Sequence, residues 1–177
     1  MVQKADSFEL YHYTRGFLED IAQKGLRVLN WPKHADYVYS KIPGPSRHLF
    51  KVLIDHTQLD KLNHSVRVNR IHLTTVAEKD DPMGIAPLTS FFGGEYIRRV
   101  LCEAGNDEAL EILKIIGFPL KITAVIPRGY LSEYHTNNLD TIQNGTFRAG
   151  SDTDVWVDKD IETQFMKRID KCILPSS

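Results

Sequence analysis

The segment 8–25 constrains the fold most, because it predicts a strand, a short helix and a stop in quick succession. Apolar and aromatic residues at 8–13 are typical of a strand. The apolar residues within 17–21 predict one face of a helix, which Gly25 ends. Because side chains alternate along a strand, His12 and Thr14 share one face. We expect the Thr14 hydroxyl to cap the following helix.

The rest of the chain interleaves strand-like and helix-like patterns. We expect strands at 66–74, 120–126, 146–149 and 154–158, helices at 49–62, 95–104, 106–117 and 162–171, and loops at 31–46, 80–94 and 130–144. With 177 residues and no visible repeat or linker, the chain has the length of one domain. The sequence therefore predicts a single α+β domain over residues 1–177, with helices around its sheet.

The charge balance argues against a chain that is drawn as a whole to nucleic acid or membranes. Lysine and arginine number 22 against 23 acidic residues, and the formal net charge is −1. A local basic groove stays open as an alternative. No apolar run approaches the roughly 18 residues of a membrane span, and Lys4, Asp6 and Glu9 interrupt any apolar leader. We expect no membrane contact and a cytoplasmic location.

The cysteines and histidines do not predict a metal centre. Cys102 and Cys172 lie far apart without a CxxC partner, which favours buried free thiols. The seven histidines form neither an HxH nor an HExxH motif. We therefore expect no bound metal.

His12 and Thr14 are the strongest candidates for chemistry. One interpretation is a histidine near the end of a strand that is bonded to a neighbouring carbonyl. The other is a ligand for a nucleotide, because Tyr11 and Tyr13 offer rings that stack on a base. Arg15 adds a cation for a phosphate. The sequence makes a nucleotide-using protein the leading hypothesis.

Two segments carry a resemblance to a known family. The run Leu-Tyr-His-Tyr-Thr, its short helix and the following Gly-Leu resemble the opening of the ADP-ribosyltransferase superfamily. The run Thr-Asp-Val-Trp-Val near the end is similar to the late strand of its DNA-modifying toxins. The resemblance implies a split, mixed or antiparallel sheet, a ribose-binding role for His12, and Asp154 as the catalytic carboxylate. The superfamily usually has Glu at that position. Glu162 is the nearby alternative, unless it is simply an acidic residue in the first turn of a helix.

The middle of the chain offers a second set of residues for this resemblance. In the superfamily an aromatic or hydroxyl residue follows the second nucleotide-facing strand, and Thr74, Phe92 and Tyr96 are the matching candidates. Glu95 is the second choice for the catalytic carboxylate. Its other interpretation is a capping glutamate after the Gly93-Gly94 turn.

The resemblance implies an enzyme that transfers ADP-ribose from NAD to an acceptor nucleic acid or protein. His12 and Thr14 orient the nucleotide, and Arg15 and Arg27 are our candidates for its phosphates. The toxin-like members imply a defence role and an antitoxin partner. Two alternatives stay open: a 2′-phosphotransferase that processes RNA, and an inactive nucleotide-binding module of the same fold.

Overall fold

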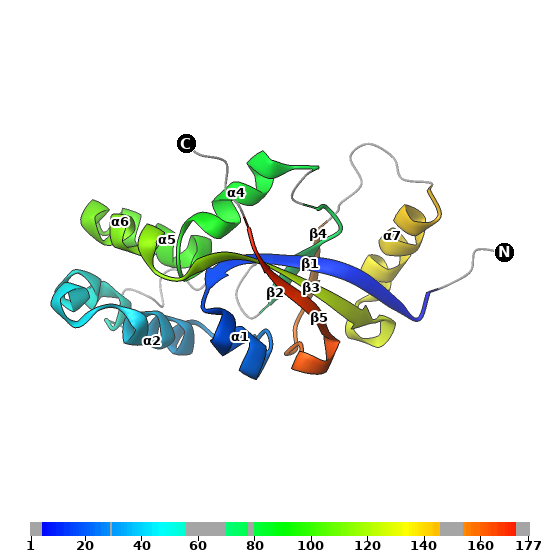
Figure 1. Cartoon of the computed structure of the whole chain (residues 1–177), viewed down its shortest axis with the longest axis horizontal. Helices are drawn as coiled ribbons and strands as arrows, with labels where there is room; N and C mark the ends of the chain where they lie inside the picture. The colour runs from blue at the N-terminus through cyan, green and yellow to red at the C-terminus, as the bar shows by residue number, and fades with distance from the viewer. Residues whose placement is uncertain (1–4, 29, 56–69, 78–79, 146–153, 173–177) are drawn as a thin grey trace.

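The fold is built on a central strand that pairs along both of its edges. The computed structural model describes residues 5–28, 30–55, 70–77, 80–145 and 154–172. Its described strands form one antiparallel sheet with the order β4-β2-β1-β3-β5 (Figure 1). The strands are β1 (Ser7–Gly16), β2 (Ile71–Thr74), β3 (Phe118–Pro127), β4 (Asp154–Val157) and β5 (Met166–Lys171). The prediction of a single α+β domain is confirmed.

Helices surround this sheet. They are α1 (Leu18–Lys24), α2 (Trp31–Lys41), α4 (Pro82–Ser90), α5 (Gly94–Glu103), α6 (Asp107–Ile115) and α7 (Glu133–Gln143), with the 3-10 helices η1 (Gly44–Leu53), η3 (Arg128–Tyr130) and η4 (Thr163–Phe165). Figure 1 shows α4 above the sheet, α1 below it, and α2, α5 and α6 grouped at one end.

The two faces of the sheet differ in what covers them. The face that carries Leu10 and Ile122 packs against Ile21 and Leu26, which lie in and just after α1, and we call it the α1 face. The opposite face carries Tyr13, which packs against Ile85 of α4, and we call it the α4 face. Apolar side chains alternate along β1 and β3 because only every second residue reaches the main core.

The helices α2, α5 and α6, together with η1, form a separate apolar core that we call the helical cluster. Its largest fully buried side chains include Phe50, Phe92 and Leu101. Gly93, the N-cap residue just before α5, has φ +86° and lies so close to Ile97 that an added Cβ would sit 2.7 Å from the Ile97 side chain. Glycine is therefore required for the turn that seats Phe92 in this core.

Two segments that the sequence predicts as loops contain helices instead. Each of these helices begins after a residue whose side chain caps it. The segment 31–46 contains α2, and the Asn30 side chain caps this helix by accepting a hydrogen bond from the Lys33 amide. Pro32 fits there because the first helical turn needs no amide donor. The segment 130–144 contains α7, capped by Ser132, and its buried residues include Leu139. The many polar residues in both segments favoured the prediction of loops over helices.

Three further predictions are wrong. The segment 80–94 contains α4, with Asp81 as its side-chain cap. The helix expected at 162–171 is the short helix η4 followed by β5, which pairs with β3. Thr14 caps no helix, because β1 continues to Gly16 and α1 begins only after Phe17. The expected strand 146–149 and the second half of the expected 49–62 helix, residues 56–62, lie outside the described residues, whereas residues 49–53 belong to the 3-10 helix η1.

Candidate active site

His12 is held by the backbone of the neighbouring strand. Its Nδ1 lies 2.7 Å from the carbonyl oxygen of His72 in β2. A carbonyl can only accept a hydrogen bond, so Nδ1 carries the proton. Burial lowers the pKa of His12, although the bond to His72 acts in the opposite direction. The neutral ring therefore keeps a lone pair on Nε2, which suits it to accept a hydrogen bond from a hydroxyl group.

Side chains of β1 form hydrogen bonds to the backbone of the β2 segment from both faces of the sheet. His12 reaches it from the α1 face, and the Tyr13 hydroxyl donates to the carbonyl of Val76 at 3.2 Å from the α4 face. The Thr74 hydroxyl accepts a hydrogen bond from the Val76 amide at 3.1 Å and closes the turn after β2. Thr74 is thus used in a backbone turn at the end of its strand.

The structure places His12 and Asp154 on opposite faces of the sheet. Tyr11 lies opposite Thr74, and Thr74 lies opposite Asp154, so these three side chains share the α4 face. His12 follows Tyr11 directly in β1 and points to the α1 face. The expectation that the imidazole and this acid converge on one sugar is therefore wrong. Asp154 is exposed at the start of the edge strand β4.

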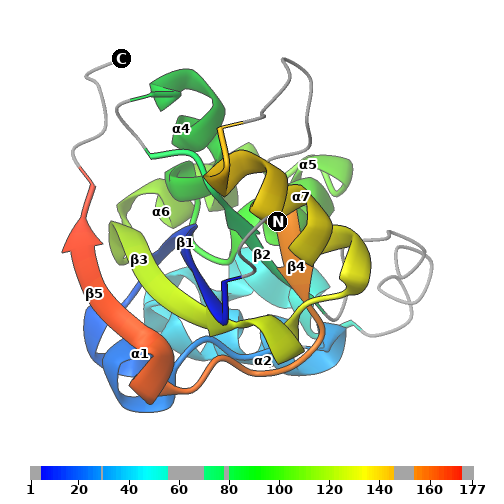
Figure 2. The ribbon, with the colours of Figure 1, turned by 90° about the vertical axis from the view of Figure 1, so that its right-hand side faces the viewer.

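A group of aromatic side chains lies on the α4 face beside Asp154, and the sequence did not predict that they lie together. Trp156 stands opposite His72 in the β2–β4 pair, with ring centroids 6.4 Å apart. The buried His135 ring of α7 lies perpendicular to the Trp156 indole with centroids 4.1 Å apart, and the Arg70 guanidinium lies 5.1 Å from the indole centroid. Figure 2 shows α7 next to β4. The pairing of β2 with β4 and the contact of α7 with Trp156 bring these distant residues together.

Thr14 and Arg15 have separate surroundings. Thr14 is half-buried on the α1 face, two residues from His12 and opposite Leu120 of β3. The Arg15 Nε donates to the carbonyl of Ile116 at 2.8 Å, and burial lowers the pKa of its guanidinium. Arg15 thus ties β1 to the end of α6, which gives it a structural role in this fold.

Three predicted site residues belong to the helical cluster. Phe92 is only 1% exposed and meets Phe17 edge-on at 5.4 Å, so the expectation that it stacks on a ligand is wrong for this structure. Tyr96 is half-buried against the same core, and burial raises the pKa of its hydroxyl. Glu95 is exposed in the first turn of α5. None of the three side chains belongs to the sheet that carries His12.

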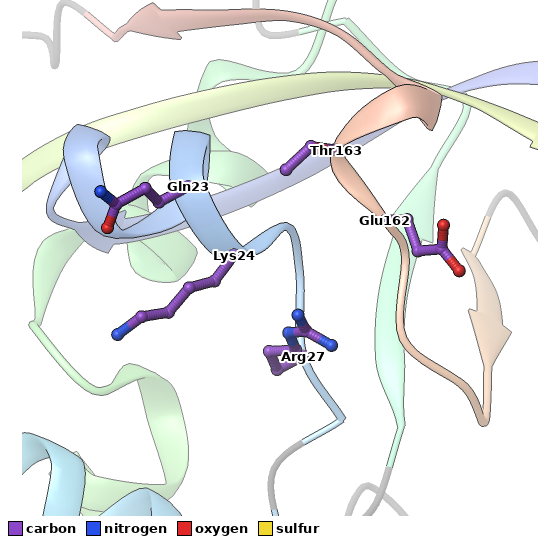
Figure 3. A pocket seen from close by; sticks show the side chains of 5 residues that line it. All are labelled: Gln23, Lys24, Arg27, Glu162 and Thr163. Carbon is purple, nitrogen blue, oxygen red and sulfur yellow. The ribbon is translucent and has the colours of Figure 1, made fainter.

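A shallow hollow of about 370 Å³ lies between the C-terminal end of α1 and the start of η4. Figure 3 shows the side chains that line it: Gln23, Lys24, Arg27, Glu162 and Thr163. In that view the Glu162 carboxylate points away from Gln23 and Lys24. The hollow therefore presents two cationic side chains together with amide and hydroxyl groups, which suits an anionic polar ligand.

The Arg27 guanidinium at this hollow is oriented by an acid that the sequence did not single out. Its Nη1 lies 2.6 Å from Asp160, whose other carboxylate oxygen accepts from the Val28 amide at 2.8 Å. The bond to Arg27 lowers the pKa of Asp160. Leu26 and Ile161 exchange backbone hydrogen bonds, which fixes the two sides of the hollow relative to each other.

The described part of the chain holds no group of three or more potential metal-ligating side chains. Within the same ranges, every helix is too short or too polar to cross a lipid bilayer. In comparisons with known proteins, no family model matches the chain, and no curated protein or solved structure is detectably similar to it.

Proposed function

We propose that this protein binds NAD and transfers its ADP-ribose to an acceptor nucleic acid or protein in the cytoplasm. The observation that carries the proposal is the half-buried His12 ring, whose proton is held on Nδ1 by the His72 carbonyl. This leaves Nε2 as a fixed acceptor for a ribose hydroxyl. The resemblance of the segment around His12 to the ADP-ribosyltransferase superfamily supports the same assignment.

The proposed reaction breaks the bond between ribose C1′ and the nicotinamide nitrogen. Nicotinamide leaves with the bonding electron pair and becomes neutral, while positive charge develops on the ribose. A nucleophilic atom of the acceptor then bonds to C1′ and loses its proton. The protein contributes hydrogen bonds that orient the ribose and a carboxylate that stabilises the developing charge.

A carboxylate that works together with His12 must lie on the same side of the sheet. Glu162 meets this requirement, because it follows Ile161, which packs into the core on the α1 face. Glu162 does not lie in the first turn of an α-helix but immediately before the short helix η4. We therefore place Glu162 before Asp154 and Glu95 as the candidate acid. Lys24 and Arg27 are the matching candidates for the diphosphate.

The test measures NAD binding by calorimetry and nicotinamide release by chromatography. The variant His12→Asn keeps an N–H donor for the His72 carbonyl but removes the Nε2 acceptor. We expect it to weaken NAD binding about fivefold, the effect of one lost hydrogen bond. The control is His48→Asn, since exposed His48 also bonds a carbonyl through Nδ1, at 2.9 Å from Pro45. Absence of NAD binding by the wild-type protein would refute the proposal.

The second candidate is a nucleotide-binding module without transferase activity. The placement of His12 and Asp154 on opposite faces favours it, because the expected acid and imidazole do not meet. The variants Glu162→Gln, Asp154→Asn and Glu95→Gln separate the two functions. Loss of nicotinamide release in one variant with retained NAD binding identifies the catalytic acid. NAD binding without any nicotinamide release by the wild-type protein identifies the module.

A further inference from the structure

We infer that Trp156 is a positioning residue for His12, which acts from the opposite face of the sheet by holding the backbone that orients the imidazole. The effect on the ring stands on the structure alone, whereas its consequence for NAD rests on the proposed function. The strand β2 has little backbone pairing with β1, whereas its other edge pairs fully with β4, which carries Trp156.

The strand β2 depends on side chains for its position. It has four residues, Ile71–Thr74, and in the described part of the chain one pair, Tyr11 opposite Thr74, defines its register with β1. By contrast, β1 and β3 pair over ten residues. The other edge of β2 pairs with β4 over all four residues, but the single pair with β1 does not by itself hold β2 in place against β1. The bond from His12 to the His72 carbonyl is therefore sensitive to any movement of β2.

Trp156 supplies the packing that the ladder lacks. Its indole lies across from His72 in the neighbouring strand β4, and cross-strand ring pairs stabilise sheets. The same indole contacts the His135 ring at 4.1 Å with an interplanar angle of 87°. The Arg70 guanidinium, immediately before β2, lies 5.1 Å from the indole centroid. One side chain thus joins β2, β4 and α7.

The consequence concerns the position of the proton on His12. While the His72 carbonyl stays within hydrogen-bond distance of Nδ1, the proton is held there and Nε2 accepts. If β2 shifts, Nδ1 loses this partner and the proton can occupy either nitrogen. A ring with the proton on Nε2 no longer accepts a hydroxyl hydrogen bond at that atom. Trp156 therefore determines whether Nε2 of His12 can accept a hydrogen bond from a ligand, although the two side chains lie on opposite faces of the sheet.

The test measures the tautomer of His12 by the nitrogen-15 chemical shifts of its ring, in the full chain. In the wild-type protein we expect the Nδ1–H tautomer. In Trp156→Ala we expect the Nε2–H tautomer to become detectable, and in Trp156→Phe, which keeps a ring, we expect the wild-type state to be largely restored. Tyr130→Ala is the matched control, because the Tyr130 ring of η3 packs edge-on against the Phe165 ring of η4, with centroids 5.3 Å apart, outside the β2–β4 pair.

A second variant gives an independent result in case Trp156→Ala does not fold. His72→Ala removes the ring that faces Trp156 but leaves the carbonyl, so it should shift the His12 tautomer in the same direction as Trp156→Ala. An unchanged His12 tautomer in folded Trp156→Ala, or an equal change in Tyr130→Ala, would overturn the inference. About fivefold weaker NAD binding in Trp156→Ala is the further expectation. Wild-type protein that fails to bind NAD while the tautomer still responds would refute only the proposed function.

Discussion

His12 donates a hydrogen bond from Nδ1 to the carbonyl oxygen of His72, 60 residues further along the chain, at a distance of 2.7 Å. This bond takes the place of ladder pairing between two strands that meet at one register pair in the described residues. The imidazole therefore has a structural task and a proposed ligand-binding task. The two tasks use different nitrogens, which makes them separable by substitution.

We predict that His12→Ala destabilises the protein by about 1–3 kcal/mol, because the partly buried His72 carbonyl loses its donor. His12→Asn should lose less, since its amide can still donate to that carbonyl. Urea unfolding monitored by circular dichroism gives both free energies. The exposed variant His48→Ala should stay within about 0.5 kcal/mol of wild type. Equal stability of His12→Ala and wild type would show that the bond contributes nothing to folding.

We predict that the protein loses stability as the pH falls from about 6.5 to 5. Burial lowers the pKa values of His12 and of His34, whose Nε2 donates to the Gly93 carbonyl at 2.8 Å. In the unfolded chain both titrate near their ordinary value of about 6.5, so the unfolded state binds more protons. Each histidine should remove about 1.4 kcal/mol per pH unit below that value until its own folded-state pKa is reached. Unfolding free energies at several pH values should show this slope, reduced in His12→Asn. A flat profile over this range would contradict it.

We predict that Gly25→Ala destabilises the protein by more than about 2 kcal/mol. Gly25 has φ +75°, and an added Cβ would lie 2.2 Å from the Ile161 carbonyl oxygen, which is backbone and cannot yield easily. The matched control is Gly105→Ala, at φ +65° with open space around its Cβ, which should cost only the strain of its backbone, about 1 kcal/mol. Thermal unfolding compares them, and similar losses in both would show that the contact with Ile161 is unimportant.

We predict that Arg27→Met changes stability by less than about 1 kcal/mol, because its ion pair with Asp160 is exposed to solvent. NAD binding should nevertheless weaken about fivefold or more, since a cation at the hollow is lost. Arg99→Met removes an equally exposed pair, with Glu103, on α5 and serves as the control. Calorimetry with NAD at low and high salt measures the effect. Unchanged affinity in Arg27→Met would exclude the hollow as the diphosphate site.

The elements with strong local signals could be predicted from the sequence. The apolar alternation at 8–13 and the β-branched run at 120–126 lie within β1 and β3, and the amphipathic pattern with its Asn106 cap lies in α6. The apolar residues of the segment 162–171 fit a helical period and predict a helix, but this segment forms η4 and β5. Its strand conformation comes from the free edge of β3, a partner that is distant in sequence.

By itself the sequence determined the α+β class, the strand around His12 and the short helix that follows it, because the last two depend on residues close together in the chain. Only the tertiary structure decided which candidate side chains meet. The register that sets Tyr11 opposite Thr74, and Thr74 opposite Asp154, places that acid on the face away from His12. A shift of one residue would reverse this outcome, since alternate side chains point to opposite faces, and no local pattern encodes that choice.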